Sequence, residues 1–455
     1  MSSVPLAWMV LVGAGSPAVL LALLGGASLV NRPLPERWTG WLTGGSMLMA
    51  SAAFSAAFVV YGATGTGTRL LSYGAWSASH QGGIAIEFLV DRLSLAFAAL
   101  SAAITGIVSA FSNRYLHRES GYNRYFVLLA MFVTGMLLVA LAGNVEVLFI
   151  GWELVGLSSA LLVGFFHERP APVSNALRVF SVYRISDTAM LSAAVLLRHQ
   201  AGTDSLSLLF GGAREASAAG LTGANATIIA VLLIVAVAGK SALLPFSSWL
   251  PRAMEGPTPS SAVYYGSLSI HAGCFLLLRS APLLEQAPAA RLLAGGLGAA
   301  TALFAGITTR VQSDVKSSLA YAALTQVGLI VVEIAIGWYT IAFVHLAGHA
   351  CFRLLQFLSA PNVLHDLHGM ESAMGDRPSP SRGYLDAVAP DRLRRGLFLV
   401  ALERGFLDSM LDRAVVEPFM RLARRLTRLD TWLCDAVMPA RRAVAAGEGE
   451  DQQDE

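Results

Sequence analysis

Long apolar runs separated by short polar loops constrain this chain more than any other feature of its sequence. A helix needs roughly 20 mostly apolar residues to cross the hydrocarbon core of a bilayer. Runs of this kind lie near residues 4–30, 40–62, 84–111, 124–143, 145–166, 175–197, 225–248, 258–280, 291–309, 317–337 and 338–360, the last two being nearly continuous. Because lipid offers no partners for backbone polar groups, we predict an all-α polytopic membrane helix bundle of about eleven spans.

The composition agrees with a chain that lies mostly in lipid. Hydrophobic residues make up 55% of the sequence and charged residues 14%, whereas soluble domains carry about 25% charged residues. A net charge of +2 is too small to favour nucleic acid. Cys274, Cys351 and Cys434 stand apart, without histidines at metal-ligand spacing. We expect neither a metal nor another cofactor in this chain. Residues 4–30 lack a preceding basic segment and exceed a signal-peptide core of roughly 7–15 residues, so they are interpreted as the first span.

The distribution of positive charge predicts the orientation. Loops after odd-numbered spans hold about ten lysines and arginines, and loops after even-numbered spans about five. Cytoplasmic loops carry the excess of basic residues in membrane proteins. We therefore expect the N-terminus outside the cell and the C-terminal tail in the cytoplasm.

The character of the sequence changes after the last run. The predicted parts are a transmembrane domain over 1–360, a linker over 361–392, an amphipathic helix over 393–436 and an acidic, disordered tail over 437–455. In the third part, apolar Leu407, Met410, Leu411 and Val415 alternate with charged Asp408, Asp412 and Arg413. This helix is expected in the cytoplasm or on the membrane surface, with a kink at Pro418.

Charged residues inside the spans point to function, since each costs about 2.5–3.5 kcal/mol at the bilayer centre on insertion scales. Glu153 lies in the middle of GWELVGLSSALLVGF, and Lys240 lies in AVAGKSALLPFSSWLP. Pro245 removes a backbone donor and is expected to break that helix beside the lysine. A lysine beside such a break can gain and release a proton, and Glu153 is a candidate partner for it. The alternative for Glu153 is a purely structural carboxylate.

Further ionisable residues follow in the last spans. His345 and His349 share one helix face, which Arg353 continues. Paired histidines suit a proton relay because their side chains titrate near neutrality. A metal site is a rival interpretation, but no third ligand stands at useful spacing. Lys316 opens the tenth run, where it is either part of the relay or an interfacial residue. His271 is interpreted more readily as a satisfied polar core residue.

Charges near the span ends suggest structural roles. Arg184 and Asp187 are three residues apart and are expected to neutralise each other. Asp91 and Glu146 stand near the ends of spans.

Three stretches resemble a known family. GWELVGLSSALLVGF, GKSALLPFSSWLPRAMEGPTPSSA and QSDVKSSLAYAALTQVG are similar to the antiporter-like subunits of respiratory complex I and of Mrp sodium/proton antiporters, over roughly residues 85–360. The resemblance implies that Glu153 and Lys240 form a proton-transfer pair. It also implies that Lys316, His345 and His349 belong to a central polar axis.

Several departures from the family pattern bear on the mechanism. Tyr265 stands where relatives usually carry a histidine, and His271 lies further on. Arg353 stands where a lysine is usual, and arginine holds charge without releasing a proton. Later spans of the family, with a second broken helix, are not found in this sequence, so we expect the outlet half-channel to be rebuilt or supplied by a partner.

The C-terminal stretches HACFRLLQFLSAPNVLHDLHGMESAMG and LERGFLDSMLDRAVVEPFMRLARRL resemble the short membrane subunits (DabB) of DAB inorganic-carbon accumulation complexes. That resemblance implies a bacterial inner-membrane protein with a cytoplasmic zinc partner, DabA, similar to β-carbonic anhydrase. Flow of H⁺ or Na⁺ would then drive hydration of CO₂ to bicarbonate. A complex I-like or hydrogenase subunit, an Mrp-type antiporter and a structural membrane anchor remain alternatives. No flavin, iron–sulfur or nucleotide motif indicates redox chemistry in this chain.

Overall fold

The computed structural model describes residues 3–64, 67–75, 85–210, 221–312, 314–374, 390–406, 409–410 and 412–437. The chain divides into two compact units, Met1–Glu403 and Arg404–Glu455, which are described separately.

Within the described residues, eleven helices are long and apolar enough to cross a membrane, as predicted. The eighth span, Thr258–Arg279, combines α11 (Thr258–Ser260), the π-helical η3 (Ser261–Leu268) and α12 (Ser269–Arg279). The other spans contain α1 (Ser3–Leu29), α2 (Glu36–Thr64), α3 (Arg92–Tyr115), α4 (Tyr122–Leu141), α5 (Val145–Val163), α6 (Pro170–Ala201), α9 (Gly223–Lys240), α14 (Pro288–Thr308), α15 (Val315–Ile336) and α16 (Tyr339–Met374).

The weakly marked boundary between the last two spans is a true helix end. Gly337 has a left-handed backbone with φ +94°, and its N–H bonds to the carbonyl of Ile334. Glycine adopts this conformation without the steric cost that a Cβ brings, so it ends helices of this kind. The chain therefore turns back into the membrane after Gly337.

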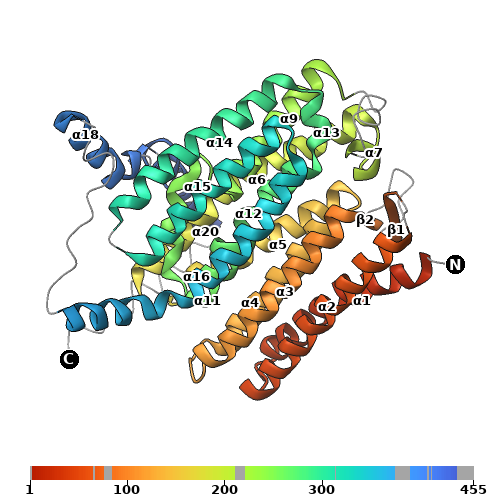
Figure 1. Cartoon of the computed structure of the whole chain (residues 1–455), viewed down its shortest axis with the longest axis horizontal. Helices are drawn as coiled ribbons and strands as arrows, with labels where there is room; N and C mark the ends of the chain where they lie inside the picture. Colours follow the sequence, from red (N-terminus) through yellow and green to blue (C-terminus); the bar gives the residue numbers. More distant parts are fainter. Residues whose placement is uncertain are drawn as a thin grey trace. The chain divides into compact units, whose positions relative to one another are not determined.

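The first unit packs its spans in two groups that meet where α4 packs on α5 and around the eighth span (Figure 1). Helices α1 to α4 contact one another, and the second group contains α5, α6, α9, α14, α15 and α16. The eighth span contacts α3, α4, α9, α15 and α16, and it is entirely buried. A fully enclosed helix does not face lipid, so its polar residues face the neighbouring helices.

A short hairpin and an ion pair fix one end of the bundle. Strand β1 (Arg69–Ala75) pairs antiparallel with β2 (Ala85–Val90). Directly after it, Asp91 caps α3 by accepting the Ser94 N–H at 2.7 Å, and it pairs with Arg279 at 2.5 Å. Burial alone would raise the pKa of Asp91, but Arg279 and the hydrogen bonds outweigh it and hold that pKa below its ordinary value. The structural role expected for Asp91 is the one seen.

The C-terminal part differs in detail from the sequence-based division. Helix α16 continues to Met374, into the predicted linker, of which residues 375–389 lie outside the described residues. Helix α18 (Asp391–Leu402) packs against α14 in the first unit. In place of one continuous helix over 393–436, the backbone is interrupted at Gly405, with φ +68°.

The second unit contains α20 (Glu417–Val437), whose described apolar residues include exposed Leu422, Leu426 and Leu429. Pro418 is the second residue of α20 and follows directly on the π-helical η6 (Asp412–Val416), so the helix is irregular where proline removes a backbone donor. Residues 407, 408, 411 and 438–455, which include parts of the predicted amphipathic pattern and the tail, lie outside the described residues.

Candidate functional site

The seventh span is interrupted, and its helix ends on a lysine. Helix α9 stops at Lys240, and the chain continues through η1 (Phe246–Ser248), α10 (Trp249–Arg252) and η2 (Ala253–Glu255). The break begins before Pro245, which immediately precedes η1 and follows a cis peptide bond. The lysine thus lies at the end of α9 where unpaired carbonyls carry partial negative charge.

Side chains of neighbouring elements satisfy the backbone groups that the break releases. Trp249 Nε1 donates to the carbonyl of Gly239 at 2.9 Å, and Thr301 Oγ1 on α14 accepts the N–H of Leu244 at 3.0 Å. Irregular backbone at membrane depth is tolerated when protein covers it in this way. The break is therefore a built feature of the fold.

Lys240 is fully buried, with 0% of its side chain exposed. Its Nζ donates to the carbonyl of Trp152 at 3.2 Å and lies 4.3 Å and 4.9 Å from the ring centroids of Tyr183 and Trp152. Aromatic faces attract a desolvated cation. The nearest carboxylate oxygen is Oδ1 of Asp187, at 3.9 Å.

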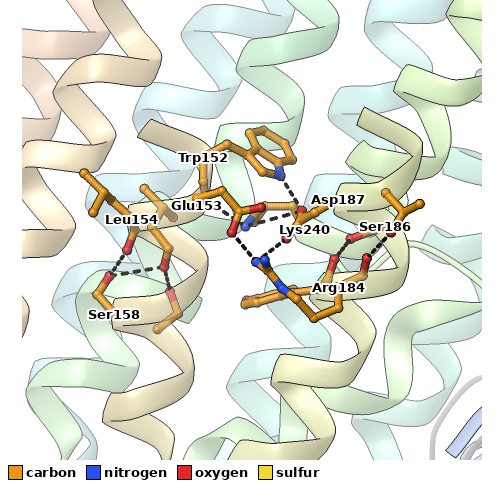
Figure 2. Close-up of polar contacts among 12 residues, drawn as sticks. Trp152, Glu153, Leu154, Ser158, Arg184, Ser186, Asp187 and Lys240 are labelled. Atoms are coloured by element: carbon orange, nitrogen blue, oxygen red, sulfur yellow. Dashed lines mark hydrogen bonds and ion pairs between the residues drawn. The ribbon is translucent and has the colours of Figure 1, made fainter. Parts of the chain in front are cut away.

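The partner of Lys240 differs from the one the sequence suggested. Glu153, the predicted counter-charge, forms its ion pair with Arg184 and none with Lys240 within 4 Å, while Asp187 takes the place beside the lysine. Arg184 also donates to Asp187 Oδ2 at 2.8 Å and so joins the two carboxylates, as Figure 2 shows. The reason is the spacing on α6: Arg184 and Asp187 are one turn apart on the helix that packs against α9.

The four charges form a compact group of zero formal charge: two cations, Lys240 and Arg184, and two carboxylates, Asp187 and Glu153. Asp187 is 3% exposed and also accepts Trp152 Nε1 at 2.6 Å. Glu153 is 26% exposed, and its Oε1 is buried without a hydrogen-bond partner among the described residues. The group thus runs from an enclosed lysine to a more accessible glutamate.

Gly156 is a site residue that sequence reasoning missed. A Cβ at this position would lie 2.8 Å from Lys240 Nζ. The glycine of the WELVG stretch therefore leaves the space that the ammonium group occupies. The signal was present in the sequence, since Gly156 follows Glu153 on the adjacent turn of α5.

A second polar group contains three of the predicted residues, and it includes His271. His271 Nε2 and His349 Nδ1 are 2.9 Å apart, His271 Nδ1 is 2.6 Å from the carbonyl of Ser267, and Arg353 Nε donates to His349 Nε2 at 3.0 Å. His271 is 0% exposed and His349 6%. His271 is therefore a member of the imidazole cluster as well as a satisfied buried residue.

The two end groups of this row, Arg353 and the carbonyl of Ser267, fix the direction of every hydrogen bond between them. A guanidinium donates only, and a carbonyl accepts only. His349 must therefore accept at Nε2 and donate from Nδ1, and His271 must accept at Nε2 and donate to Ser267. Both imidazoles are neutral in this arrangement. We call Arg353, His349, His271 and the Ser267 carbonyl the imidazole chain.

His345 stands apart from the imidazole chain, with its ring centroid 6.3 Å from that of His349. Its Nδ1 is 2.9 Å from Glu333 Oε1, and its Nε2 is 3.1 Å from Gln326 Oε1. Glu333 and Gln326, both on α15, were not singled out from the sequence. A carboxylate inside the apolar run LIVVEIAIG was the available signal for Glu333.

Lys316 lies near the broken segment. Its Nζ is 3.3 Å from the carbonyl of Gly256 and 3.5 Å from that of Met254. It therefore binds carbonyl groups at the end of η2, where a cation is favoured.

A hydrogen bond links the residue that follows Lys240 to the residue that precedes His271. Ser241, the residue after Lys240, donates from Oγ to the carbonyl of Ile270, the residue before His271, at 2.6 Å. Within the described ranges, no three side chains of His, Cys, Asp or Glu converge as a metal site would require.

Comparisons with known proteins match the region that carries these groups. Residues 142–375 match the family described as NADH:quinone oxidoreductase/Mrp antiporter, TM, and residues 76–126 match NADH-Ubiquinone oxidoreductase (complex I), chain 5 N-terminus. NADH-quinone oxidoreductase subunit L of Mycobacterium tuberculosis is 34% identical over 333 residues, covering 70% of this chain and 52% of that protein. NADH-ubiquinone oxidoreductase chain 5 of Metridium senile is 33% identical and covers 77% and 57%.

Solved structures show the same fold. The Mrp complex of Dietzia sp. DQ12-45-1b contains a chain with a TM-score of 0.65 and 28% identity, covering 90% of this chain and 44% of that one. A chain of an archaeal membrane-bound sulfane sulfur reductase has a TM-score of 0.67 at 19% identity, a likeness of fold alone. The chain spans about half the length of the curated relatives it matches.

Proposed function

Since the chain belongs to the family of antiporter-like membrane subunits of complex I-type NADH:quinone oxidoreductases and Mrp antiporters, we propose that it carries protons across a membrane as one subunit of a larger complex. The observation that carries this proposal is Lys240, a fully buried lysine at a helix break beside Asp187. Ionisable residues are kept at such depth mainly for transport or proton relay.

The arrangement supports a proton relay in chemical terms. Lys240 can lose its proton and remain in contact with the Trp152 carbonyl and the two aromatic faces. Loss of the proton leaves one uncompensated negative charge among Asp187, Glu153 and Arg184. Protonation of the partly exposed Glu153 would then restore neutrality, so the two events are linked through Arg184.

A finer proposal concerns the complex in which the chain works. The resemblance of its C-terminal stretches to DabB subunits supports a cytoplasmic, DabA-like zinc partner that hydrates CO₂ to bicarbonate, driven by the flow of H⁺ or Na⁺. The exposed apolar face of α20, with Leu422, Leu426 and Leu429, is the surface we assign to this partner. The predicted orientation, with the tail in the cytoplasm, agrees with that assignment.

A complex I-type or Mrp-type assembly is the second candidate. It is favoured by the names of the relatives, which are subunits of quinone oxidoreductases and of an Mrp complex. The two candidates differ in the proteins that co-purify with the chain. Zinc in stoichiometric amounts in the purified complex would favour the first, and quinone-reducing subunits would favour the second.

The proposed transport is tested with the complex purified from its own host and placed in liposomes. A potassium gradient with valinomycin sets the membrane potential, and an enclosed dye reports the internal pH. We expect wild type to move protons, Lys240→Met to move at least tenfold fewer, and the exposed-charge control Arg32→Gln to equal wild type. Equal flux in wild type and Lys240→Met would contradict the proposal.

Deletion of residues 404–455 tests the assignment of α20. We expect the truncated chain to enter the membrane and to lose the soluble partner. A complex that stays intact after this deletion would contradict the docking role of the second unit.

A further inference from the structure

Glu333 is a membrane-embedded carboxylate that the predicted relay does not include. It stands in α15, four residues before Gly337, or about 6 Å along the helix axis from the loop that joins the last two spans. Its side chain is 19% exposed. Its Oε1 is hydrogen-bonded to His345 Nδ1, and its Oε2 is buried with no hydrogen-bond partner among the described residues.

Both ring nitrogens of His345 have a side-chain hydrogen-bond partner on α15. Nδ1 faces a carboxylate oxygen of Glu333 at 2.9 Å, and Nε2 faces the amide oxygen of Gln326 at 3.1 Å. The carboxylate only accepts, so Nδ1 donates to Glu333 whether the ring is neutral or charged. Nε2 donates to the amide oxygen of Gln326 when the ring carries the second proton.

Gln326 allows the same site to exist without the extra proton. Rotation of its amide by half a turn would present the NH₂ group to Nε2, which then accepts. The imidazole would keep its bond from Nδ1 to Glu333 in both states. Both ring nitrogens of His345 therefore keep a hydrogen-bond partner when the proton leaves. Proton exchange does not carry the free-energy cost of an unsatisfied buried polar atom.

The other ionisable groups near this site do not compete for the proton. His349 and His271 use all four ring nitrogens in the imidazole chain, and Arg353 holds a fixed charge. Among the described residues, the buried thiol of Cys274 on α12 also lies within electrostatic reach of Glu333. Glu333 is therefore the nearby carboxylate that stabilises a charge on His345.

We propose that Glu333, His345 and Gln326 form a proton-loading site close to the loop between α15 and α16. Loading forms an N–H bond at His345 Nε2 and breaks an O–H bond of a hydronium ion, which leaves as water, and unloading reverses both. This inference rests on the proposed function for its role in transport. The binding of a proton at this site stands independently of that role.

Two readouts separate the proposal from a structural role for Glu333. Glu333→Gln keeps an oxygen that accepts from Nδ1 and removes the negative charge. We expect proton flux in the liposome assay to fall at least tenfold, and Glu333→Asp to recover part of it. Glu285→Gln is the matched control, because Glu285 also accepts a hydrogen bond, from the Tyr339 hydroxyl at 3.0 Å, and is exposed.

Proton binding is measured without transport by infrared difference spectra of the complex carrying ring-labelled histidine. The wild-type spectra should contain a pH-dependent histidine component that is absent from His345→Gln. In Glu333→Gln the midpoint of that signal should move toward acid by at least about one pH unit, the effect of losing a nearby opposite charge. If Glu333→Gln fails to assemble, Gln326→Glu serves in its place, with the midpoint expected to move toward alkaline pH.

The outcomes distinguish the two proposals. Absence of flux in wild type with an intact histidine signal overturns the proposed transport and leaves the loading site standing. Flux that depends on Lys240, together with an unchanged histidine midpoint in Glu333→Gln, overturns the loading site alone. Normal flux in Glu333→Gln shows that the carboxylate has no part in the path.

Discussion

Replacing Asp187 by asparagine should destabilise the protein more than replacing Glu153 by glutamine. Asparagine keeps an oxygen that accepts from Trp152 Nε1, so the change removes the charge and the hydrogen bond that Oδ2 accepts from Arg184. Lys240 would then remain buried, with no carboxylate in contact with its ammonium group. Glu153 and Arg184, by contrast, are 26% and 38% exposed, and Arg184 keeps Asp187 as a second partner, so the loss of that pair leaves no fully buried charge unpaired.

The magnitude follows from the distance of 3.9 Å between Lys240 Nζ and Asp187 Oδ1. At an effective dielectric constant of about 20, Coulomb's law gives an attraction of about 4 kcal/mol. Breaking a buried pair by removing one partner costs about 3–5 kcal/mol in known cases. For Glu153 and Arg184 we expect a smaller loss, because Arg184 keeps its ion pair with Asp187.

The assay is a double-mutant cycle on the free energy of unfolding of the full chain in bilayers or detergent. Asp187→Asn and Lys240→Met should each be destabilising, and the double variant should recover most of the loss because no buried charge is left unpaired. A parallel cycle with Glu153→Gln should show weaker coupling to Lys240. Additive losses for Asp187 and Lys240, or stronger coupling to Glu153, would refute the assignment of Asp187 as the partner.

Three further outcomes are expected. Gly156→Ala should reduce proton flux at least tenfold in the liposome assay, since its Cβ would lie 2.8 Å from Lys240 Nζ. The folded protein holds the pKa of Asp91 low, so its ion pair with Arg279 contributes its full stabilisation above the unfolded pKa of about 3.9. That stabilisation is lost as the pH falls through the lower folded pKa. In thermal unfolding, Arg279→Gln should therefore lose less stability than wild type when the pH is lowered over this range. Trp249→Phe should cost about 1–3 kcal/mol of unfolding free energy, because it leaves the carbonyl near the end of α9 buried without its donor.

Much of the architecture could be predicted from hydropathy, because a bilayer admits few alternatives to the helix. The spans follow from the length of the apolar runs, and the boundary between the last two spans falls at Gly337. Lys240 could be found for the same reason, since a charge in an apolar run is conspicuous.

The partners within the site could not be predicted in the same way. Glu153 and Asp187 are both acidic residues in spans that precede that of Lys240. Which of them pairs with the lysine depends on how α5, α6 and α9 pack. Likewise, the stacking of His345 on His349 was expected from their spacing, but His349 turns to His271 on α12 and His345 to Glu333 on α15. Contacts between helices depend on rotation about each axis, which the sequence pattern leaves open.

The fixed direction of the imidazole chain makes it an insulator. A row of hydrogen bonds conducts when a proton enters at one end, leaves at the other and reverses every bond on the way. Arg353 does not release a proton, and the Ser267 carbonyl does not hold one, so neither end allows that reversal. The centre of the bundle therefore contains an ordered polar row that resists leakage, and a proton crosses it only when a bond to His271 or His349 opens.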